Sequence, residues 1–210
     1  MTADKKPVPT FQIEADLIEQ GLNPVCGIDE AGRGPWSGPV VAAAVILDGE
    51  NIPDGVNDSK KLSPMRRIEI FNAIKQTSYV GIGIVSVSDI DRLNILQATF
   101  LAMRKAVENL ETAPAVALID GTGKPTLSCK MQTLIKGDQR SLSVAAASII
   151  AKVTRDRIME NLALQFPHYG WERNKGYGTK AHRAGLASHG VSKHHRRSFK
   201  PIQALLQGRF

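Results

Sequence analysis

The sequence has little of what marks secreted and membrane proteins. It contains two cysteines, Cys26 and Cys129, whose spacing matches no metal site, so two reduced thiols are favoured over a disulfide. No apolar run approaches the roughly 18 residues that a membrane-spanning helix needs. Residues 1–10 hold no apolar core of a secretory signal. Internal repeats and low-complexity segments are also absent. We therefore expect a cytoplasmic protein without a membrane segment.

The charge of the chain is biased toward one sign. Its 210 residues carry 27 Lys and Arg against 20 Asp and Glu, a net charge of +7. This bias favours a polyanionic partner, either nucleic acid or an anionic membrane surface, and solubility alone would also account for it. The length and the 42% hydrophobic content suit a globular domain with a real core. The bias is strongest in residues 171–200, with eight Lys or Arg against one acid.

Hydrophobic periodicity predicts an α/β fold with a mixed sheet. Gly81 and Gly83 leave one strand face bare, which indicates close packing against a neighbour. Helices are expected after the N-cap Ser63, from Ser88 as one long helix, and over residues 141–165. The first of these has an apolar face made of Met65, Ile68, Phe71 and Ile74. Strands are expected before Asp29 and over residues 40–47, 79–87, 115–119 and 131–135.

The chain shows no linker that would separate two domains. Residues 1–9 are polar and carry two prolines, so a flexible tail is expected there. Residues 10–170 hold the alternating strands and helices and form the main domain. Residues 171–210 are interpreted as a basic helical extension packed on the same domain.

Four acidic residues stand where predicted strands or turns end. Asp29 and Glu30 close the first strand and precede a glycine turn, Asp120 closes a later strand, and Asp138 lies in a turn before the long helix. α/β proteins place their sites at such edges. Converging carboxylates repel unless cations lie among them, and hard oxygen ligands suit Mg²⁺ or Mn²⁺. Two such ions about 4 Å apart form a clamp for displacement at phosphorus.

Each acid also has a plain structural interpretation. Asp29 and Glu30 would fit an acidic hairpin turn, Asp120 a turn before glycine, and Asp138 the approach to a helix. The four acids together, beside a glycine loop and a basic segment, favour a catalytic site over these structural roles. Neighbouring strand residues point to opposite faces, so Glu30 is expected past the strand end if it shares a site with Asp29.

Six motifs, in order along the chain, resemble those of the ribonuclease HII family. They run from about residue 24 to residue 202, which is nearly the whole chain. The motifs are Gly27-Ile28-Asp29-Glu30-Ala31-Gly32-Arg33-Gly34-Pro35, Asp58-Ser59-Lys60-Lys61-Leu62, Lys136-Gly137-Asp138, Ala146-Ala147-Ser148-Ile149 with Lys152-Val153-Thr154-Arg155-Asp156, Lys175-Gly176-Tyr177-Gly178-Thr179, and His194-His195-Arg196-Arg197-Ser198-Phe199.

The resemblance implies a ribonuclease H-like fold: a central mixed five-stranded sheet flanked by helices, with a C-terminal helical extension. It implies a monomeric endonuclease that cuts RNA in RNA–DNA hybrids. It also implies cleavage on the 5′ side of a ribonucleotide embedded in duplex DNA, the first step of ribonucleotide removal, leaving a 3′-hydroxyl and a 5′-phosphate. The ligands of the two Mg²⁺ or Mn²⁺ ions would be Asp29, Glu30, Asp120 and Asp138. Many members carry Asn after Asp-Gly, where this chain has Thr122.

Specificity would rest on the 2′-hydroxyl of the ribose. Gly32 and Gly34 let the main chain approach the sugar, and the family assigns recognition to residues 32–34, including Arg33, and to Tyr177. Lys60, Lys61 and the basic tail, including Lys175, Lys180, Arg183, Arg196 and Arg197, are expected at backbone phosphates. His194 and His195 lack cysteine partners and are interpreted as structural or phosphate-facing.

Two rival functions share the fold. A non-enzymatic nucleic-acid-binding module would lack one of the acids, and all are present. A junction resolvase would not need the glycine loop and Tyr177. Residues 203–210 weakly resemble a sliding-clamp peptide, and a closing helix is the competing interpretation.

Overall fold

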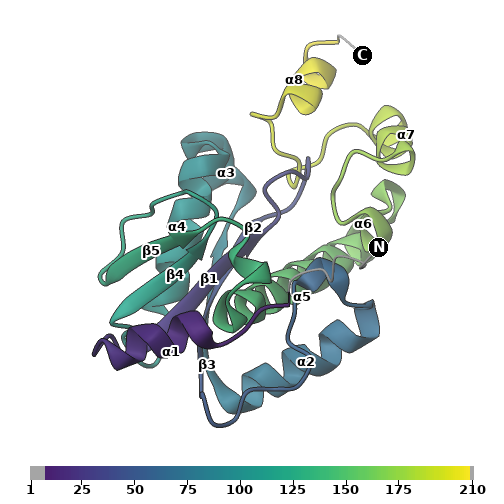
Figure 1. Cartoon of the computed structure of the whole chain (residues 1–210). Helices are drawn as coiled ribbons and strands as arrows, with labels where there is room; N and C mark the ends of the chain where they lie inside the picture. Colours follow the sequence, from purple (N-terminus) through teal and green to yellow (C-terminus); the bar gives the residue numbers. More distant parts are fainter. Residues whose placement is uncertain (1–7, 209–210) are drawn as a thin grey trace, which may run out of the picture.

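The computed structural model describes residues 8–208, and a five-stranded mixed sheet lies at its centre (Figure 1). The strand order is β3-β2-β1-β4-β5. β1 pairs antiparallel with β2 and parallel with β4, while β2–β3 is antiparallel and β4–β5 parallel. This confirms the predicted fold class. The strands are β1 Val25–Ala31, β2 Val40–Leu47, β3 Ser78–Val85, β4 Val116–Asp120 and β5 Lys130–Leu134.

Helices cover both faces of the sheet. In Figure 1, α3 and α4 lie on one side, α2 and α5 on the other, and α6 to α8 gather at one end. The longer helices are α1 Gln12–Glu19, α2 Pro64–Thr77, α3 Val87–Leu93, α4 Ile95–Glu108, α5 Leu142–Gln165, α6 Trp171–Asn174, α7 Lys180–His189 and α8 Lys200–Leu206. Short 3₁₀ turns are η1 Ser59–Lys61, η2 Gly137–Gln139 and η3 Pro167–Tyr169. In the described part of the chain, every helix is too short or too polar to cross a membrane.

β2 is buried along its whole length because both of its faces are covered. Ala42 and Ala44 belong to the core cluster under α4, whereas Ala43 and Val45 belong to the cluster under α5. A strand covered on both sides reads as a continuous apolar run rather than an alternating one. The sequence VVAAAVIL is such a run, and its small residues let the two helical layers approach.

Glycine sets how closely the helices approach the sheet. A Cβ at Gly83 would overlap the carbonyl oxygen of Ala102 in α4, and one at Gly27 would overlap the backbone of Ser143 in α5. The predicted close packing of the glycine-bearing strand is therefore confirmed. The same contact fixes the start of α5 against β1, immediately beside the strand end that carries Asp29.

Two helix predictions were wrong in detail. The long helix expected from Ser88 is two helices, because Ser86 caps α3 and Asn94, at φ 69°, caps α4 through bonds to Leu96 N and Gln97 N. Asn is a good N-cap, whereas hydrophobic periodicity runs through the break unchanged. The first turn of α2 does not pack on the core, and Met65 is 75% exposed.

The buried face of α2 is displaced from the one predicted. Ile68 is 45% exposed, and Ile70, Phe71 and Ile74 pack against α5 and β2. The cap itself is as predicted, since the Ser63 hydroxyl accepts a bond from Arg66 N and Pro64 takes the first helical position. The error arises because spacing by three identifies an apolar stripe without showing which turns reach the sheet.

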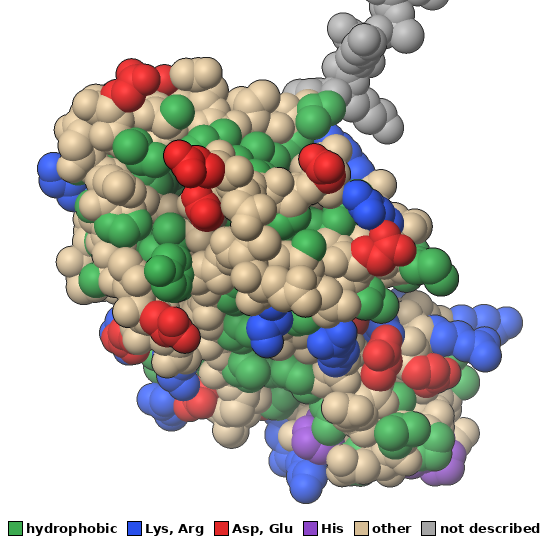
Figure 2. All heavy atoms as spheres, turned by 90° about the horizontal axis from the view of Figure 1, so that it is seen from below, with side chains coloured by type: hydrophobic (Ala, Val, Ile, Leu, Met, Phe, Trp, Pro, Cys, Tyr) green, Lys and Arg blue, Asp and Glu red, His purple; other side chains and the backbone are tan. Residues whose placement is uncertain are grey.

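The C-terminal elements pack on the outer half of α5. Met159 and Ala163 of α5 join Trp171, Leu186 and Ile202 in one apolar cluster. The proposed division at residue 170 stays a prediction, and most of the predicted tail, residues 1–7, lies outside the described residues. All five histidines lie in residues 168–195, so the purple side chains in Figure 2 mark this end of the molecule, where Lys and Arg also gather.

Candidate active site

Three of the four predicted acids meet at the carboxyl edge of the sheet. β1 and β4 are parallel and pair Ile28 with Ile119, so Asp29 and Asp120 follow at neighbouring positions. Asp138 is brought beside them by η2, because Gly137 N donates a 2.7 Å bond to Asp120 Oδ1. Asp29 and Asp138 are both buried. The fold thus brings Asp29 together with two acids that lie about 90 and 110 residues farther along the chain.

Glu30 does not lie past the strand end, as the sequence led us to expect. It pairs with Ala42 inside β1, so it points to the α4 face and Asp29 to the α5 face. It nevertheless lines the same cavity as Asp29, of about 390 Å³, because that cavity opens around the end of the strand. Arg33 Nη1 donates a 3.2 Å bond to Glu30 Oε1 and turns the carboxylate toward the loop.

The carboxylates at the carboxyl edge of the sheet lie close enough to repel one another. Burial, and then repulsion from Glu30, Asp120 and Asp138, raises the pKa of Asp29 well above its usual range. Burial also raises the pKa of Glu30 and of Asp138, although Arg33 opposes the shift in the first case. Lys60 Nζ lies 4.0 Å from Asp138 Oδ2. The edge therefore holds more negative charge than its own side chains neutralise.

The donor set suits a hard divalent cation. In residues 8–208, no group of three or more His, Cys, Asp or Glu side chains is already gathered tightly enough to hold a metal. The acids share the edge, but some of their oxygens are engaged by other groups, such as the N–H of Glu30 on Asp29 Oδ1 at 2.7 Å. Mg²⁺ keeps several waters and uses one or two carboxylates, so it needs no closed cage. A cation there would offset the repulsion that raises the pKa of Asp29.

The predicted recognition residues line the same cavity as Asp29. Gly32, Arg33 and Gly34 form one wall, Lys60 another, and Tyr177 closes a side. A Cβ at Gly34 would lie 3.4 Å from the Tyr177 ring, so the loop and the ring face each other. Tyr177 is 50% exposed and leaves its ring open to a ligand. Lys61, at the end of η1, is exposed and does not line this cavity.

Arg196 was misplaced by sequence reasoning, which put it at a phosphate. It is completely buried behind the glycine loop. Its guanidinium donates to the carbonyl oxygens of Gly32 at 2.5 Å, Arg33 at 2.9 Å and Gly38 at 2.9 Å. Burial lowers the pKa of Arg196 to about 9, so it stays charged at neutral pH. A basic tail gives no sequence signal that one of its arginines turns inward.

The bonds from Arg196 set the direction of the loop amides. In a trans peptide the C=O and the following N–H point in opposite directions. With the carbonyls of Gly32 and Arg33 turned toward Arg196, the N–H groups of Arg33 and Gly34 point away from it. These are two donors on a loop that lines the cavity beside Asp29.

Arg155 is a second buried arginine that the sequence did not single out. It donates to the carbonyls of Pro39 at 3.0 Å, Ser37 at 3.1 Å and Lys175 at 2.9 Å. Burial lowers the pKa of Arg155 to about 10. It thereby joins the glycine loop to the loop that carries Tyr177.

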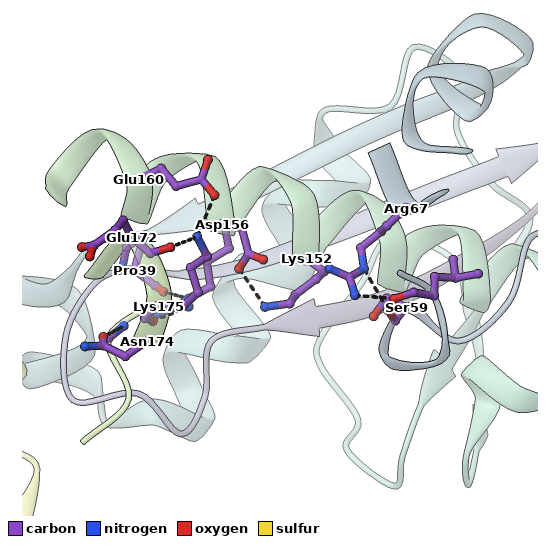
Figure 3. A network of polar contacts seen from close by, with 12 residues as sticks. Pro39, Ser59, Arg67, Lys152, Asp156, Glu160, Glu172, Asn174 and Lys175 are labelled. Carbon is purple, nitrogen blue, oxygen red and sulfur yellow. Dashed lines mark hydrogen bonds and ion pairs between the residues drawn. The ribbon is translucent and has the colours of Figure 1, made fainter. Parts of the chain in front are cut away.

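Lys175 was also expected at a phosphate, and its ammonium is instead engaged within the protein. It lies 2.6 Å from Glu160 Oε1 and 2.6 Å from the carbonyl of Glu172 (Figure 3). In the same view Arg67 reaches the carbonyl of Ser59 and fixes the start of the Lys60 turn. Both contacts hold loops around the cavity.

Two histidines form a buried chain of bonds beneath Tyr177. His195 Nδ1 accepts from Ser192 N at 3.0 Å, His195 Nε2 lies 3.0 Å from His182 Nε2, and His182 Nδ1 lies 2.9 Å from the carbonyl of Tyr177. Burial lowers the pKa of His195 to about 3 and also lowers the pKa of His182. Both rings are therefore neutral, and each carries one N–H that donates to the next acceptor of the chain. Of the two interpretations given for His195, the structural one holds.

Comparison with known proteins identifies close relatives. The model of the family described as ribonuclease HII matches residues 26–202. Ribonuclease HII of Magnetococcus marinus is 55% identical over 205 residues, covering 95% of this chain and 96% of that protein. Ribonuclease HII of a Jannaschia species is 55% identical and covers 95% and 99%.

Solved structures share the fold. Ribonuclease H2 from Pyrococcus horikoshii superposes with a TM-score of 0.76 at 27% identity, covering 88% of this chain and 98% of that one. The ribonuclease HII of Archaeoglobus fulgidus, solved in a complex with PCNA, gives 0.71 at 30% identity, covering 84% and 95%.

Proposed function

This chain belongs to the ribonuclease HII family of metal-dependent endoribonucleases, which cut the RNA of RNA–DNA hybrids, and we propose that it also cuts on the 5′ side of single ribonucleotides embedded in duplex DNA. The cut hydrolyses the phosphodiester and leaves a 3′-hydroxyl and a 5′-phosphate. The observation that carries the proposal is the glycine loop, held open by Arg196, directly beside the buried Asp29. Recognition of the sugar and cleavage of the adjacent bond then occur in one cavity.

The acids are proposed to hold two divalent ions, Mg²⁺ or Mn²⁺. When bound, such ions activate a water and stabilise the leaving 3′-oxygen. Asp29 and Asp120, at neighbouring positions of β1 and β4, are suited to contact both. Glu30, from the α4 face, and Asp138, from η2, complete the set. Lys60, whose side chain is 82% exposed and whose Nζ lies 4.0 Å from Asp138 Oδ2, is proposed to meet the phosphate.

The 2′-hydroxyl is proposed to meet the amides of Arg33 and Gly34 and the ring of Tyr177. The hydroxyl is the one group that separates a ribose from a deoxyribose, and it both donates and accepts. Only a side with no Cβ lets the main chain approach it, which is the role we assign to Gly34, whose bare side faces the Tyr177 ring, whereas the bare side of Gly32 accommodates Arg155. Lys61 lies outside this cavity and is proposed to bind phosphate farther along the duplex.

One gel tests the proposed function. A duplex with a single ribonucleotide, labelled at the 5′ end, is incubated with and without Mg²⁺, and the cut is mapped to the nucleotide. We expect a metal-dependent cut on the 5′ side of the ribonucleotide and none in the all-DNA duplex. A binding module would leave both duplexes intact, and a resolvase would cut a four-way junction instead.

Replacement of Tyr177 by Ala is expected to lower kcat/KM for a single embedded ribonucleotide roughly tenfold to hundredfold, because it removes both a hydrogen bond and a stacking ring. Tyr177→Phe keeps the ring and should lose only the part due to the hydroxyl. Steady-state kinetics and duplex affinity are compared for both variants. Equal losses in affinity and in kcat/KM would remove the proposed role.

Residues 203–210 are proposed to contact a sliding clamp, in analogy with the complex of the Archaeoglobus protein. Leu206 is 51% exposed on α8, while Phe210 lies outside the described residues. The double change Leu206→Ala, Phe210→Ala should weaken clamp binding about tenfold or more in calorimetry, because apolar anchors carry most of such an interface. Leu205, which packs on the core, stays in place, so cleavage of naked duplex should be unchanged. Unaltered clamp affinity would leave α8 as a closing helix only.

A further inference from the structure

A cavity of about 540 Å³ lies outside the candidate active site, between α3, α4 and the connection from β4 to β5. Its lining includes Arg92, Arg104 and Lys124 and no acidic residue. All three cations are exposed.

This basic cavity neighbours the catalytic edge. A smaller cavity of about 240 Å³ shares Phe100 with it. The smaller cavity also contains Asp120, and it shares Glu30 and Arg33 with the cavity that holds Asp29. The three cavities are therefore neighbours that share lining residues, in the order Tyr177 cavity, Asp120 cavity and basic cavity.

The cations in the basic cavity are available to a ligand. Arg104 Nε lies 3.7 Å from Glu108 Oε1, and both side chains are about half exposed. Arg92 pairs with Asp89 at 2.8 Å, also on the surface. Exposed ion pairs of this kind contribute little free energy, so a phosphate can replace the acid at small cost. Phe100, at the junction of the two cavities, offers an apolar surface to a sugar or a base.

We propose that the basic cavity binds a backbone phosphate of the substrate strand, some nucleotides away from the bond that is cut. The inference rests on the proposed function only in taking a polynucleotide as the substrate. Three exposed cations, two of them with acid partners on the surface that a phosphate can replace, match a phosphodiester, and a strand bound there would continue past the neighbouring cavities toward the acids. Such a contact positions the duplex and carries no sequence information.

The test compares two double variants with the same change in net charge. Arg104→Gln, Lys124→Gln removes two cations of the basic cavity. Lys75→Gln, Lys130→Gln removes two exposed lysines at the opposite edge of the sheet, at the end of α2 and the start of β5. Each pair is placed in the Asp29→Asn background, and affinity for a long RNA–DNA hybrid is measured by anisotropy over a range of salt concentrations.

We expect the cavity variant to bind the long hybrid about tenfold more weakly and to lose roughly 1 to 2 units of the slope of log K against log salt, as for one or two lost phosphate contacts. The matched control should keep both values. Equal effects of the two variants, or no effect of either, would overturn the proposal. If the wild-type chain cut no embedded ribonucleotide but the cavity variant still lost the salt slope, the proposed function would be wrong and the phosphate site would stand.

Discussion

Asp29→Asn is expected to lower the rate of hybrid cleavage at least about a thousandfold, or about 4 kcal/mol of activation free energy, with hybrid affinity nearly unchanged. Asp29 is a buried acid in β1, next to Asp120. Asparagine keeps the shape and one acceptor oxygen but removes the charge that attracts divalent ions. Because phosphate contacts supply most of the affinity, binding should survive.

Asp29→Asn is also expected to change the melting temperature of the protein. The Asp29 carboxylate is buried and repelled by three neighbouring acids, which is why its pKa is raised. In EDTA, Asp29→Asn should therefore melt at or above the temperature of the wild-type chain. Added Mg²⁺ should raise the melting temperature of the wild type more than that of the variant, because a ligand stabilises the state that binds it.

The matched control for charge is Asp54→Asn, an exposed acid in the turn before η1, for which no change in rate is expected. Cleavage by Asp29→Asn at the wild-type rate with Mg²⁺ would show that the acids at the strand ends do not carry the chemistry. Loss of hybrid binding together with cleavage would instead place Asp29 in the binding of nucleic acid.

The gathering of the acids could be predicted from the sequence, whereas their orientations could not. Apolar runs that end at Asp29 and Asp120 predicted acids at strand ends, and the structure places these two ends side by side because β1 and β4 pair in parallel. Alternation along a strand then seemed to exclude Glu30 from the site unless it lay on the turn. The cavity reaches both faces of the sheet at the end of β1, so Asp29 and Glu30 line it together although alternation points them to opposite faces.

Local signals succeeded where a single residue decides the backbone. Ser63 and Pro64 correctly predicted the start of α2, and the two glycines of β3 correctly predicted close packing against another element, which is α4. Asn94 was missed because its cap interrupts a stripe that continues on both sides. Arg196 was missed because its burial depends on carbonyl groups more than 150 residues away in the chain, which composition does not reveal.

Arg196→Lys is expected to lower kcat/KM for a single embedded ribonucleotide roughly hundredfold, about 2.7 kcal/mol, and to destabilise the fold. Lysine keeps the charge but lacks the planar fork that bonds the carbonyls of Gly32 and Arg33 together. With those carbonyls released, the amides of Arg33 and Gly34 lose their fixed direction. The unfolding free energy should fall by on the order of 3 kcal/mol, because carbonyls are left unpaired in a buried site.

Arg155→Lys separates the two effects. Arg155 is as deeply buried and bonds three carbonyls, but none of them belongs to residues 32–34. Its replacement should cost similar stability, measured by urea unfolding, with a smaller loss of kcat/KM on the embedded ribonucleotide. Guanidinium at millimolar concentration should restore part of the cleavage by Arg196→Ala, because the ion can occupy the vacated site and bond the same carbonyls. If Arg196→Lys and Arg155→Lys lost activity only in proportion to their stability, and guanidinium did not rescue Arg196→Ala, Arg196 would be a structural residue without influence on recognition of the sugar.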